Sequence, residues 1–281
     1  MPADTTYATT TTDDIDATSF YRALGEGRYE PTIHTQGAWR EDEQHMGAPA
    51  GLIAHCLERH QPREDLMLSR ICYDILGVID LATTEVRIET IRPGRTIELL
   101  EATVTTGDSP RPAIRARAWR LQTSDTSEVA GGGPDPLPDQ DDPSRAPSWR
   151  EQSEVWPGGF IRALDIRRPD RPGLHVPGRG VVWQRTDIAL VDTEDSTDTA
   201  RFLLHADTAN GMSVREDPHA WAFPNVDLTV HLHRRPTYAW VGIASDVTFG
   251  ANGVGTTSAT LYDADGPVAR TEQSLTIRRS L

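Results

Sequence analysis

The segment FLLHADTANGMSV, residues 202–214, places one carboxylate among apolar residues. Leu203, Ala206 and Ala209 recur at helical spacing, and Asp207 follows Leu203 by four residues, on the same side of the expected helix. An ionised carboxylate is costly to bury, so Asp207 is either solvated at the helix edge or kept there for chemistry. It is therefore the first candidate for an acid or base.

The last strand-like segment carries a second polar residue within an apolar pattern. Alternation along this segment puts Gln273 on the same face as Ala269, Leu275 and Ile277. A buried amide must be hydrogen-bonded, because leaving it unpaired costs roughly 1–3 kcal/mol. Gln273 either ties strands together or orients a water or substrate, and this residue alone leaves both interpretations open.

The chain looks like two copies of one unit, each with a helix followed by antiparallel strands, which is an α+β pattern. The hairpin that begins at Ala102 has the same layout as the hairpin that begins at Ala259. The first copy has no acid at the position of Asp207 and no Gln at the position of Gln273. Polar groups needed to build the unit would occur in both copies, so these two favour a functional role.

Composition divides the chain into four parts. Residues 1–18 are rich in Thr and Asp and predict a disordered tail. Residues 19–122 form the first unit, and the segment SFYRAL at its start suggests a short helix. Residues 123–150 are dense in Pro, Gly, Ser and Asp, as linkers are. Residues 151–281 form the second unit.

Charge and hydropathy exclude several functional classes. The net charge is −14 and all 28 basic residues are Arg, which argues against non-specific nucleic-acid binding. No apolar run could span a bilayer, and the N-terminus lacks the features of a secretory signal. We therefore expect a cytoplasmic protein with no membrane or nucleic-acid partner. Cys56 and Cys72 form no CxxC pattern, and both fit small buried core residues.

Other patterns that could carry chemistry are weak. The alternation that begins at Val226 sends apolar residues to the core and His231 and His233 to the other face, and no third metal ligand is evident. Asp217 and His219 faintly resemble the Asp/His pairs of hydratases, but an Asp-Pro turn explains them better. Phosphate-binding loops and a GxSxG elbow are absent from the sequence. We expect no metal and no cofactor.

Five segments, taken in order, resemble the acyl-CoA thioesterase II family and its thioesterase-like actinobacterial relatives. They are HMGAPAGLIAHCLER, IRPGRTIELLEATV, HADTANGMS, FPNVDLTVHLHRRP and GPVARTEQSL. The resemblance runs from about residue 20 to 281, apart from the linker, and the ordered set is more specific than any single segment. It implies a double hotdog, in which two tandem antiparallel sheets wrap central helices. It also implies an acyl-CoA substrate and the pairing of two such chains into a homodimer.

The family resemblance also implies a catalytic trio of Asp, Thr and Gln around a water. The Asp falls on Asp207 and the Gln on Gln273. The Thr, two residues before an Asp, falls on Asn225 before Asp227, which is a departure. Asn can still hydrogen-bond a water, so we expect Asp207 to act as general base and the two amides to position the water.

Two further parts of the site follow from the same hypothesis. Backbone N–H groups where the first-unit helix begins, at Gly47 and Ala48, could hold the oxyanion. His45 could line this mouth, and it fits a surface position equally well. For any single basic side chain a solvated sheet edge is the common explanation. The candidates for contacts with the phosphates of coenzyme A are Arg92, Arg95, Arg234 and Arg235.

Two rival functions stay open at this point. One is a hotdog hydratase or dehydratase of enoyl thioesters, which needs an acid beside a histidine, and His205 is the nearest partner in the sequence. The other is a non-catalytic protein that binds acyl thioesters, in which Asn225 marks a decayed site. Release of thiol from acyl-CoA separates both rivals from a thioesterase.

Overall fold

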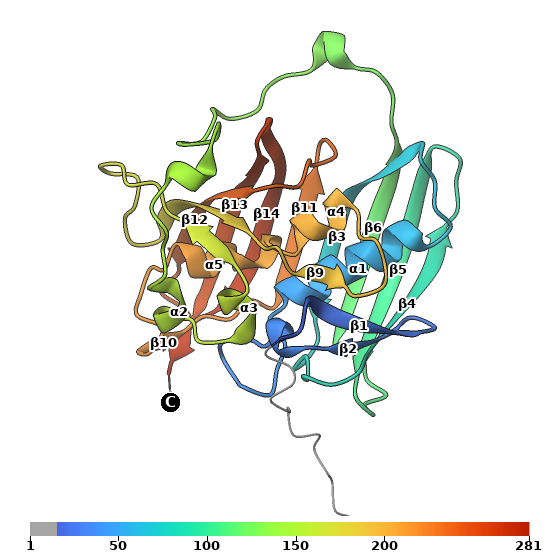
Figure 1. Cartoon of the computed structure of the whole chain (residues 1–281), viewed down its shortest axis with the longest axis horizontal. Helices are drawn as coiled ribbons and strands as arrows, with labels where there is room; N and C mark the ends of the chain where they lie inside the picture. Colours follow the sequence, from blue (N-terminus) through green and yellow to red (C-terminus); the bar gives the residue numbers. More distant parts are fainter. Residues whose placement is uncertain (1–15, 281) are drawn as a thin grey trace, which may run out of the picture.

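The computed structural model describes residues 16–280, so most of the tail expected at residues 1–18 lies outside the described residues. Helices cover one face of a long curved sheet (Figure 1). The helices of the first unit are α1 (Gly47–Arg59) and the 3-10 turn η2 (Ile33–Thr35). Its strands are β1 (Ser19–Gly25), β2 (Arg28–Pro31), β3 (Leu66–Ile75), β4 (Thr84–Arg92), β5 (Ile97–Thr106) and β6 (Ile114–Gln122).

The second unit repeats this order. The connecting segment holds η3 (Ser127–Val129) and η4 (Pro143–Arg145). The helical segments that follow are α2 (Gln152–Val155), α3 (Gly159–Arg162), α4 (Asp198–Leu203), η5 (Ala206–Thr208) and α5 (Ala209–Met212). The strands are β7 (Asp165–Arg167), β8 (Arg179–Arg185), β9 (Ala189–Val191), β10 (Trp221–Ala222), β11 (Asp227–Leu232), β12 (Val241–Phe249), β13 (Val254–Asp263), β14 (Gly266–Thr276) and β15 (Arg278–Arg279).

Strand order reveals the duplication. Within the described residues, thirteen strands form one sheet in the order β7-β8-β12-β13-β14-β11-β3-β6-β5-β4-β2-β1-β9. The two halves meet where β11 pairs antiparallel with β3, with Val230 opposite Ile71. Outward from this junction the order β3-β6-β5-β4 mirrors β11-β14-β13-β12. The hairpin of β5 and β6 therefore corresponds to that of β13 and β14, which confirms the layout predicted from Ala102 and Ala259.

Helix α1 lies in the core, with residues from Gly47 to Leu57 buried. Its two glycines lie in close contact with the second unit. A Cβ atom on Gly47 would lie 2.6 Å from the Leu204 carbonyl oxygen, and one on Gly51 would lie 3.1 Å from that of Ala200. Ordinary side chains at these positions would push α1 away from α4. The glycines thus bring the start of α1 next to the segment that carries Asp207.

The segment around Asp207 is not the continuous helix that its periodicity predicted. Helix α4 ends at Leu203, and Asp207 lies in the 3-10 turn η5 before α5 begins. Thr208 explains part of the break, because its hydroxyl donates to the His205 carbonyl at 2.8 Å and to Gln184 Oε1 at 3.1 Å. Side-chain bonds to the preceding turn bend helices, and 3-10 interruptions often mark functional positions.

Several local predictions were wrong. The segment SFYRAL forms strand β1, because Phe20 and Tyr21 are fully buried and the strand pairs with β2 and β9. Val226 is 47 % exposed, since the core-facing alternation begins only at Leu228. Cys72 is half-buried, whereas Cys56 is buried as expected.

The connecting segment is long and largely irregular. It arches over one end of the sheet before reaching α2 (Figure 1). Two contacts dock it on the second unit: the Trp183 indole N–H donates to the Pro138 carbonyl at 2.9 Å, and Gln140 Nε2 donates to that of Ala264 at 3.2 Å. The domain boundaries expected from composition stay predictions.

Candidate active site

The Asp207 carboxylate is the centre of a buried polar cluster. Its Oδ1 accepts hydrogen bonds from Asn225 Nδ2 at 2.8 Å and from Gln273 Nε2 at 3.0 Å. Its Oδ2 lies 3.5 Å from Nδ1 of His45. The side chains come from η5, β14 and the segments that precede β11 and α1. The fold thus brings together three residues predicted as catalytic and one predicted at the mouth of the site.

The two oxygens of Asp207 differ in their surroundings. Oδ1 is held by two amide donors, so its direction is fixed. Oδ2 accepts no hydrogen bond within residues 16–280, and the His45 Nδ1 that it faces is itself an acceptor for the Gly47 N–H. An ionised carboxylate can accept several hydrogen bonds, so Oδ2 keeps acceptor capacity for a further donor such as water.

Strand β14 presents Gln273 to the core as the alternation predicted, with 2 % of its surface exposed. Its Nε2 also lies 3.3 Å from the Asp207 carbonyl oxygen. The amide of Gln273 must turn Nε2 toward Asp207, because both neighbouring atoms, the carbonyl oxygen and Oδ1, are acceptors and would repel Oε1. Oε1 then points elsewhere, and no partner for it exists among residues 16–280. A buried amide oxygen without a partner is an acceptor ready for water or substrate.

Two threonines near Gln273 were missed at the sequence level. Thr257 lies directly opposite Gln273 on β13, and Thr271 lies two residues before it on β14. Both are buried, and neither hydroxyl has a hydrogen-bond partner in the described part of the chain. Alternation along β14 puts Thr271 on the same face as Gln273, and this was the signal that could have found it. With Gln273 these hydroxyls make a polar face beside Asp207.

Asn225 is positioned by the ends of two strands. It forms an isolated bridge with Leu275, and its Nδ2 also donates to the Asp227 carbonyl at 3.0 Å. The Asp227 carboxylate in turn accepts the Ser274 backbone N–H at 2.6 Å. Asp227 therefore fastens β11 to β14 next to Gln273, and it acts as a positioning residue.

Burial sets the protonation states of the site. It raises the pKa of Asp207 to about 7, although the hydrogen bonds from Asn225 and Gln273 oppose the change. It lowers the pKa of His45 to about 4. At neutral pH His45 is therefore neutral, and its contact with Asp207 is not an ion pair. Groups with a pKa close to the working pH are the effective general bases.

The backbone decides which nitrogen of His45 carries the proton. The Gly47 N–H donates to Nδ1 at 3.0 Å, so the neutral ring holds its proton on Nε2. The ring stacks on Phe160 of α3, with centroids 4.2 Å apart and an interplanar angle of 4°. Sequence reasoning placed His45 at the mouth of the site, but the acid it meets belongs to the other unit.

A small pocket lies beside the cluster, lined by His45, Thr208, Trp39, Trp156 and Met212 among others. Its volume is about 30 Å³. A single water needs roughly 10–15 Å³ by this measure and two to four polar partners. The pocket therefore has room for a water next to His45 and the turn that carries Asp207.

The predicted oxyanion donors at α1 are already used. The Gly47 N–H donates to the His45 ring, and the Ala48 N–H donates to the His45 carbonyl at 3.1 Å. Neither is free to receive a developing charge in this conformation. The sequence showed that these residues start a helix, but it could not show that the preceding histidine caps them.

The structure does not bring Arg95 and Arg234 to Asp207. Arg234 follows Asn225 by nine residues, which is about 30 Å along an extended strand. Its guanidinium pairs with the fully buried Asp263 carboxylate and donates to the Gly266 carbonyl. Arg95 lies in the turn between β4 and β5, at the same far end of the sheet. Arg92 and Arg235 likewise donate to backbone carbonyls there.

His205 also turns away from the site. Its Nδ1 lies 3.2 Å from Gln184 Oε1 and its Nε2 3.1 Å from the Tyr238 hydroxyl. Burial, helped by Arg201, lowers its pKa to about 3. His219 lies in the turn expected after Asp217, whose Oδ1 accepts the His219 N–H at 2.9 Å. No group of metal-ligating side chains occurs among residues 16–280.

Family models match both halves of the chain. The model of the acyl-CoA thioesterase N-terminal domain matches residues 35–121, and that of the C-terminal domain matches residues 134–277. The chain belongs to the acyl-CoA thioesterase family. It is therefore a thioester hydrolase, as the resemblance predicted. No curated protein matches the sequence.

Solved structures show the same fold at low sequence identity. A protein with a hot dog fold from Alicyclobacillus acidocaldarius is 15 % identical, with a TM-score of 0.71, and the match covers 96 % of this chain and 100 % of that one. A proposed thioesterase II from Thermobifida fusca YX is 18 % identical, with a TM-score of 0.67, and the match covers 95 % of this chain and 97 % of that one. The tesB protein of Mycobacterium avium subs paratuberculosis is 15 % identical, with a TM-score of 0.66, and the match covers 96 % of this chain and 100 % of that one. The double hotdog prediction is confirmed. No helix in the described range is long and apolar enough to cross a membrane.

Proposed function

We propose that this thioesterase hydrolyses acyl-CoA with a water that Asp207 activates. One observation carries the proposal: two amides fix Oδ1 of Asp207, while Oδ2 keeps acceptor capacity and faces His45, which lines a pocket with room for water. A pKa of about 7 lets the carboxylate exist as a base at neutral pH. The site draws on both units, which explains why neither copy carries all of it.

The reaction needs two proton transfers, one to and one from Asp207, and the replacement of a C–S bond by a C–O bond. The water oxygen attacks the thioester carbon while its proton passes to Oδ2 of Asp207. The tetrahedral intermediate collapses, its C–S bond breaks, and the thiolate of coenzyme A takes the proton back from Asp207. Gln273 holds the carboxylate through Nε2, and its Oε1 can accept a hydrogen bond from the second O–H of the water, which orients the nucleophile.

His45 is our candidate for the oxyanion donor in place of the α1 backbone. Its Nε2 carries a proton, because Nδ1 accepts the Gly47 N–H. The ring lines the pocket, and Phe160 fixes its plane. A neutral imidazole N–H that is held in place can stabilise a developing alkoxide without prior reorganisation.

The purified protein is expected to release free thiol from at least one member of a panel of acyl-CoA thioesters of increasing chain length. A thiol reagent follows the reaction continuously. A protein that binds acyl-CoA tightly in calorimetry but releases no thiol would contradict hydrolysis and support the non-catalytic alternative.

The second candidate function is enoyl-thioester hydration, and one contact favours it: His45 and Asp207 form the acid–histidine pair that His205 was expected to provide. Two facts speak against it. Nδ1 of His45 is occupied by Gly47, and a pKa of about 4 makes this ring a poor base. With an enoyl-CoA substrate we expect thiol release, whereas loss of the enoyl absorbance without thiol release would favour hydration.

Asn225 stands where the family resemblance places Thr. Replacing Asn225 with Thr or Ala tests whether the asparagine side chain contributes to the site. Asn225→Thr shortens the side chain, so Asp207 loses its 2.8 Å donor unless the hydroxyl reaches it. We expect kcat to fall about three- to tenfold, which corresponds to roughly 0.7–1.4 kcal/mol, the net contribution of one ordinary hydrogen bond. Asn225→Ala should lose more. An Asn225→Ala variant as active as the wild type would remove Asn225 from the site.

Other expectations depend on the sequence alone. We propose coenzyme A thioesters of fatty acid metabolism as substrates, a cytoplasmic location, and a homodimer of double hotdogs as the assembly.

A further inference from the structure

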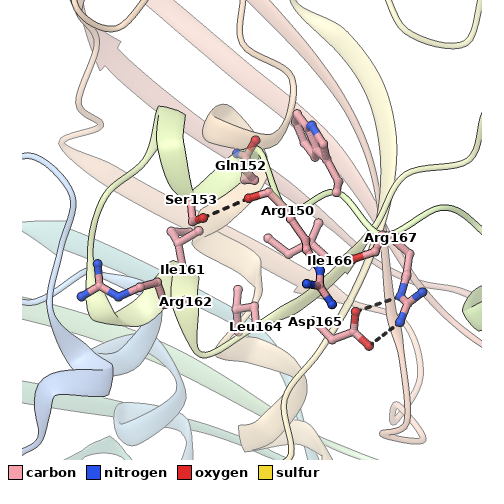
Figure 2. A pocket seen from close by; sticks show the side chains of 11 residues that line it. Arg150, Gln152, Ser153, Ile161, Arg162, Leu164, Asp165, Ile166 and Arg167 are labelled. Atoms are coloured by element: carbon pink, nitrogen blue, oxygen red, sulfur yellow. Dashed lines mark hydrogen bonds and ion pairs between the residues drawn. The ribbon is translucent and has the colours of Figure 1, made fainter. Parts of the chain in front are cut away.

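A second pocket shares Ile161 of α3 with the small pocket next to His45, and we call it the arginine pocket. It encloses about 520 Å³, within the size range of small-ligand sites. Figure 2 shows the side chains that line it, which come from α2 and the segment before it, from α3 and the residues after it, and from β7. Its polar and charged lining residues are Ser148, Arg150, Gln152, Ser153, Arg162, Asp165 and Arg167.

The charge of this pocket opposes that of the chain. Three arginines face one aspartate in it, although the whole chain carries a net charge of −14. The neighbouring pocket, which shares Trp149 and Gln152, has two arginines and two carboxylates in its lining. A local excess of guanidinium groups in an acidic protein is a feature that an anionic ligand would use.

Two of the three guanidinium groups are unpaired. Asp165 is engaged by Arg167, with contacts of 2.8 and 3.1 Å, and by Arg185 at 3.6 Å. Within residues 16–280 the side chains of Arg150 and Arg162 have no hydrogen-bond or ion-pair partner. Figure 2 places Arg150 between Arg162 on one side and the Asp165–Arg167 pair on the other. The free charges are therefore spread along the pocket instead of converging on one point.

Helix α3 joins the arginine pocket to the candidate active site. Phe160 stacks on His45, and Ile161 lines both the arginine pocket and the small pocket beside Asp207. Arg162 follows directly and lines the arginine pocket. Gln152 adds a buried Oε1 with no partner in the described residues, while its Nε2 donates to the carbonyl of Gly211 in α5, a residue that lines the small pocket. Three consecutive residues thus lead from one site to the other.

We propose that the arginine pocket binds the phosphates of the nucleotide end of coenzyme A, so that the pantetheine arm passes along α3 to Asp207. This inference rests on the proposed function. Arginine is suited to the pocket because its planar guanidinium binds phosphate oxygens in pairs. Coenzyme A carries a diphosphate and a separate 3′-phosphate. Two guanidinium groups that lie apart, those of Arg150 and Arg162, match two separated anionic groups better than they match a single phosphate.

Three thioesters with the same acyl group test the inference: those of coenzyme A, of dephospho-coenzyme A and of pantetheine without a nucleotide. Arg150→Ala and Arg162→Ala should each raise KM for acyl-CoA about fivefold, and the double variant about twentyfold or more, with kcat little changed. KM for the pantetheine thioester should not change. Arg115→Ala, an exposed arginine on β6, is the matched control and should behave as wild type.

The three substrates also separate the phosphate groups. If the substitutions raise KM for acyl-CoA but not for the dephospho-coenzyme A thioester, the pocket binds the 3′-phosphate. If they raise KM for both thioesters, the pocket also binds the diphosphate. Unchanged KM for acyl-CoA in the double variant would overturn the inference, as would an equal loss with the pantetheine thioester.

Calorimetry with coenzyme A alone keeps this test independent of turnover. Wild type should bind coenzyme A, and the double variant should bind it at least about twentyfold more weakly. This result would support the pocket even if no thioester were hydrolysed. Absence of binding by the wild type would overturn the pocket, whatever the hydrolytic activity.

Discussion

Replacing Asp207 with Asn is expected to lower kcat by about 10²–10⁴-fold, because that is the usual contribution of a positioned general base. Asn keeps the size of the side chain and can still meet a donor at Oδ1, but it cannot take a proton from water. Thiol release from the best acyl-CoA substrate measures the loss. Hydrolysis within threefold of wild type would remove Asp207 from the mechanism.

Asp207→Asn should remain folded, and at high pH its free energy of unfolding should exceed that of the wild type. The folded-state pKa of Asp207, about 7, lies above its ordinary value of 3.8, so between these values the folded state binds the proton more tightly. The stability of the wild type therefore falls as pH rises from about 4 to 7, by up to roughly 4 kcal/mol for a shift of about three units. Asp207→Asn lacks this dependence. Urea unfolding of both proteins at pH 5 and pH 8 measures the difference.

Gln273→Leu is expected to have the second largest effect, a loss of about 10²-fold in kcat. It removes the 3.0 Å donor to Asp207 and the unpaired Oε1 that we assign to the water. For wild type, kcat/KM should rise with pH to a midpoint near 7 and then level off, because Asp207 must be ionised to act as a base.

Loss of the Gln273 donor should move that midpoint upward, since the hydrogen bond lowers the pKa of Asp207. A role of Gln273 in folding alone would reduce activity without moving the midpoint, so the pH profile separates the two interpretations left open by the sequence. Gln122→Leu, at the exposed end of β6, is the matched control and should keep the wild-type profile. An unchanged midpoint in Gln273→Leu would contradict its assigned contact.

Comparison of the two copies pointed to Asp207 and Gln273 without any structure. Both break an apolar pattern in the second copy, and the first copy lacks both. Alternation along β14 also placed Gln273 on the buried face, which its 2 % exposure bears out. This worked because a two-residue period states directly which side chains share a face.

The sequence by itself determined the α+β class, the duplicated hairpins, the first-unit helix that begins at Gly47, and two residues of the candidate site, Asp207 and Gln273. All of these follow from local periodicity or from comparing one half with the other. It did not determine that residues 19–25 form a strand, because the pairing of β1 with β9 joins segments about 170 residues apart.

Only the tertiary structure decided the surroundings of Asp207. His45 reaches this carboxylate because the glycines of α1 let the two units pack closely, and Thr208 and His205 break the helix through bonds to Gln184. The structure also separated Arg234 from the site and placed Arg162 directly after Ile161, which lines the pocket next to His45. Periodicity encodes which side of an element is buried, whereas the residue it meets there depends on contacts between distant parts of the chain.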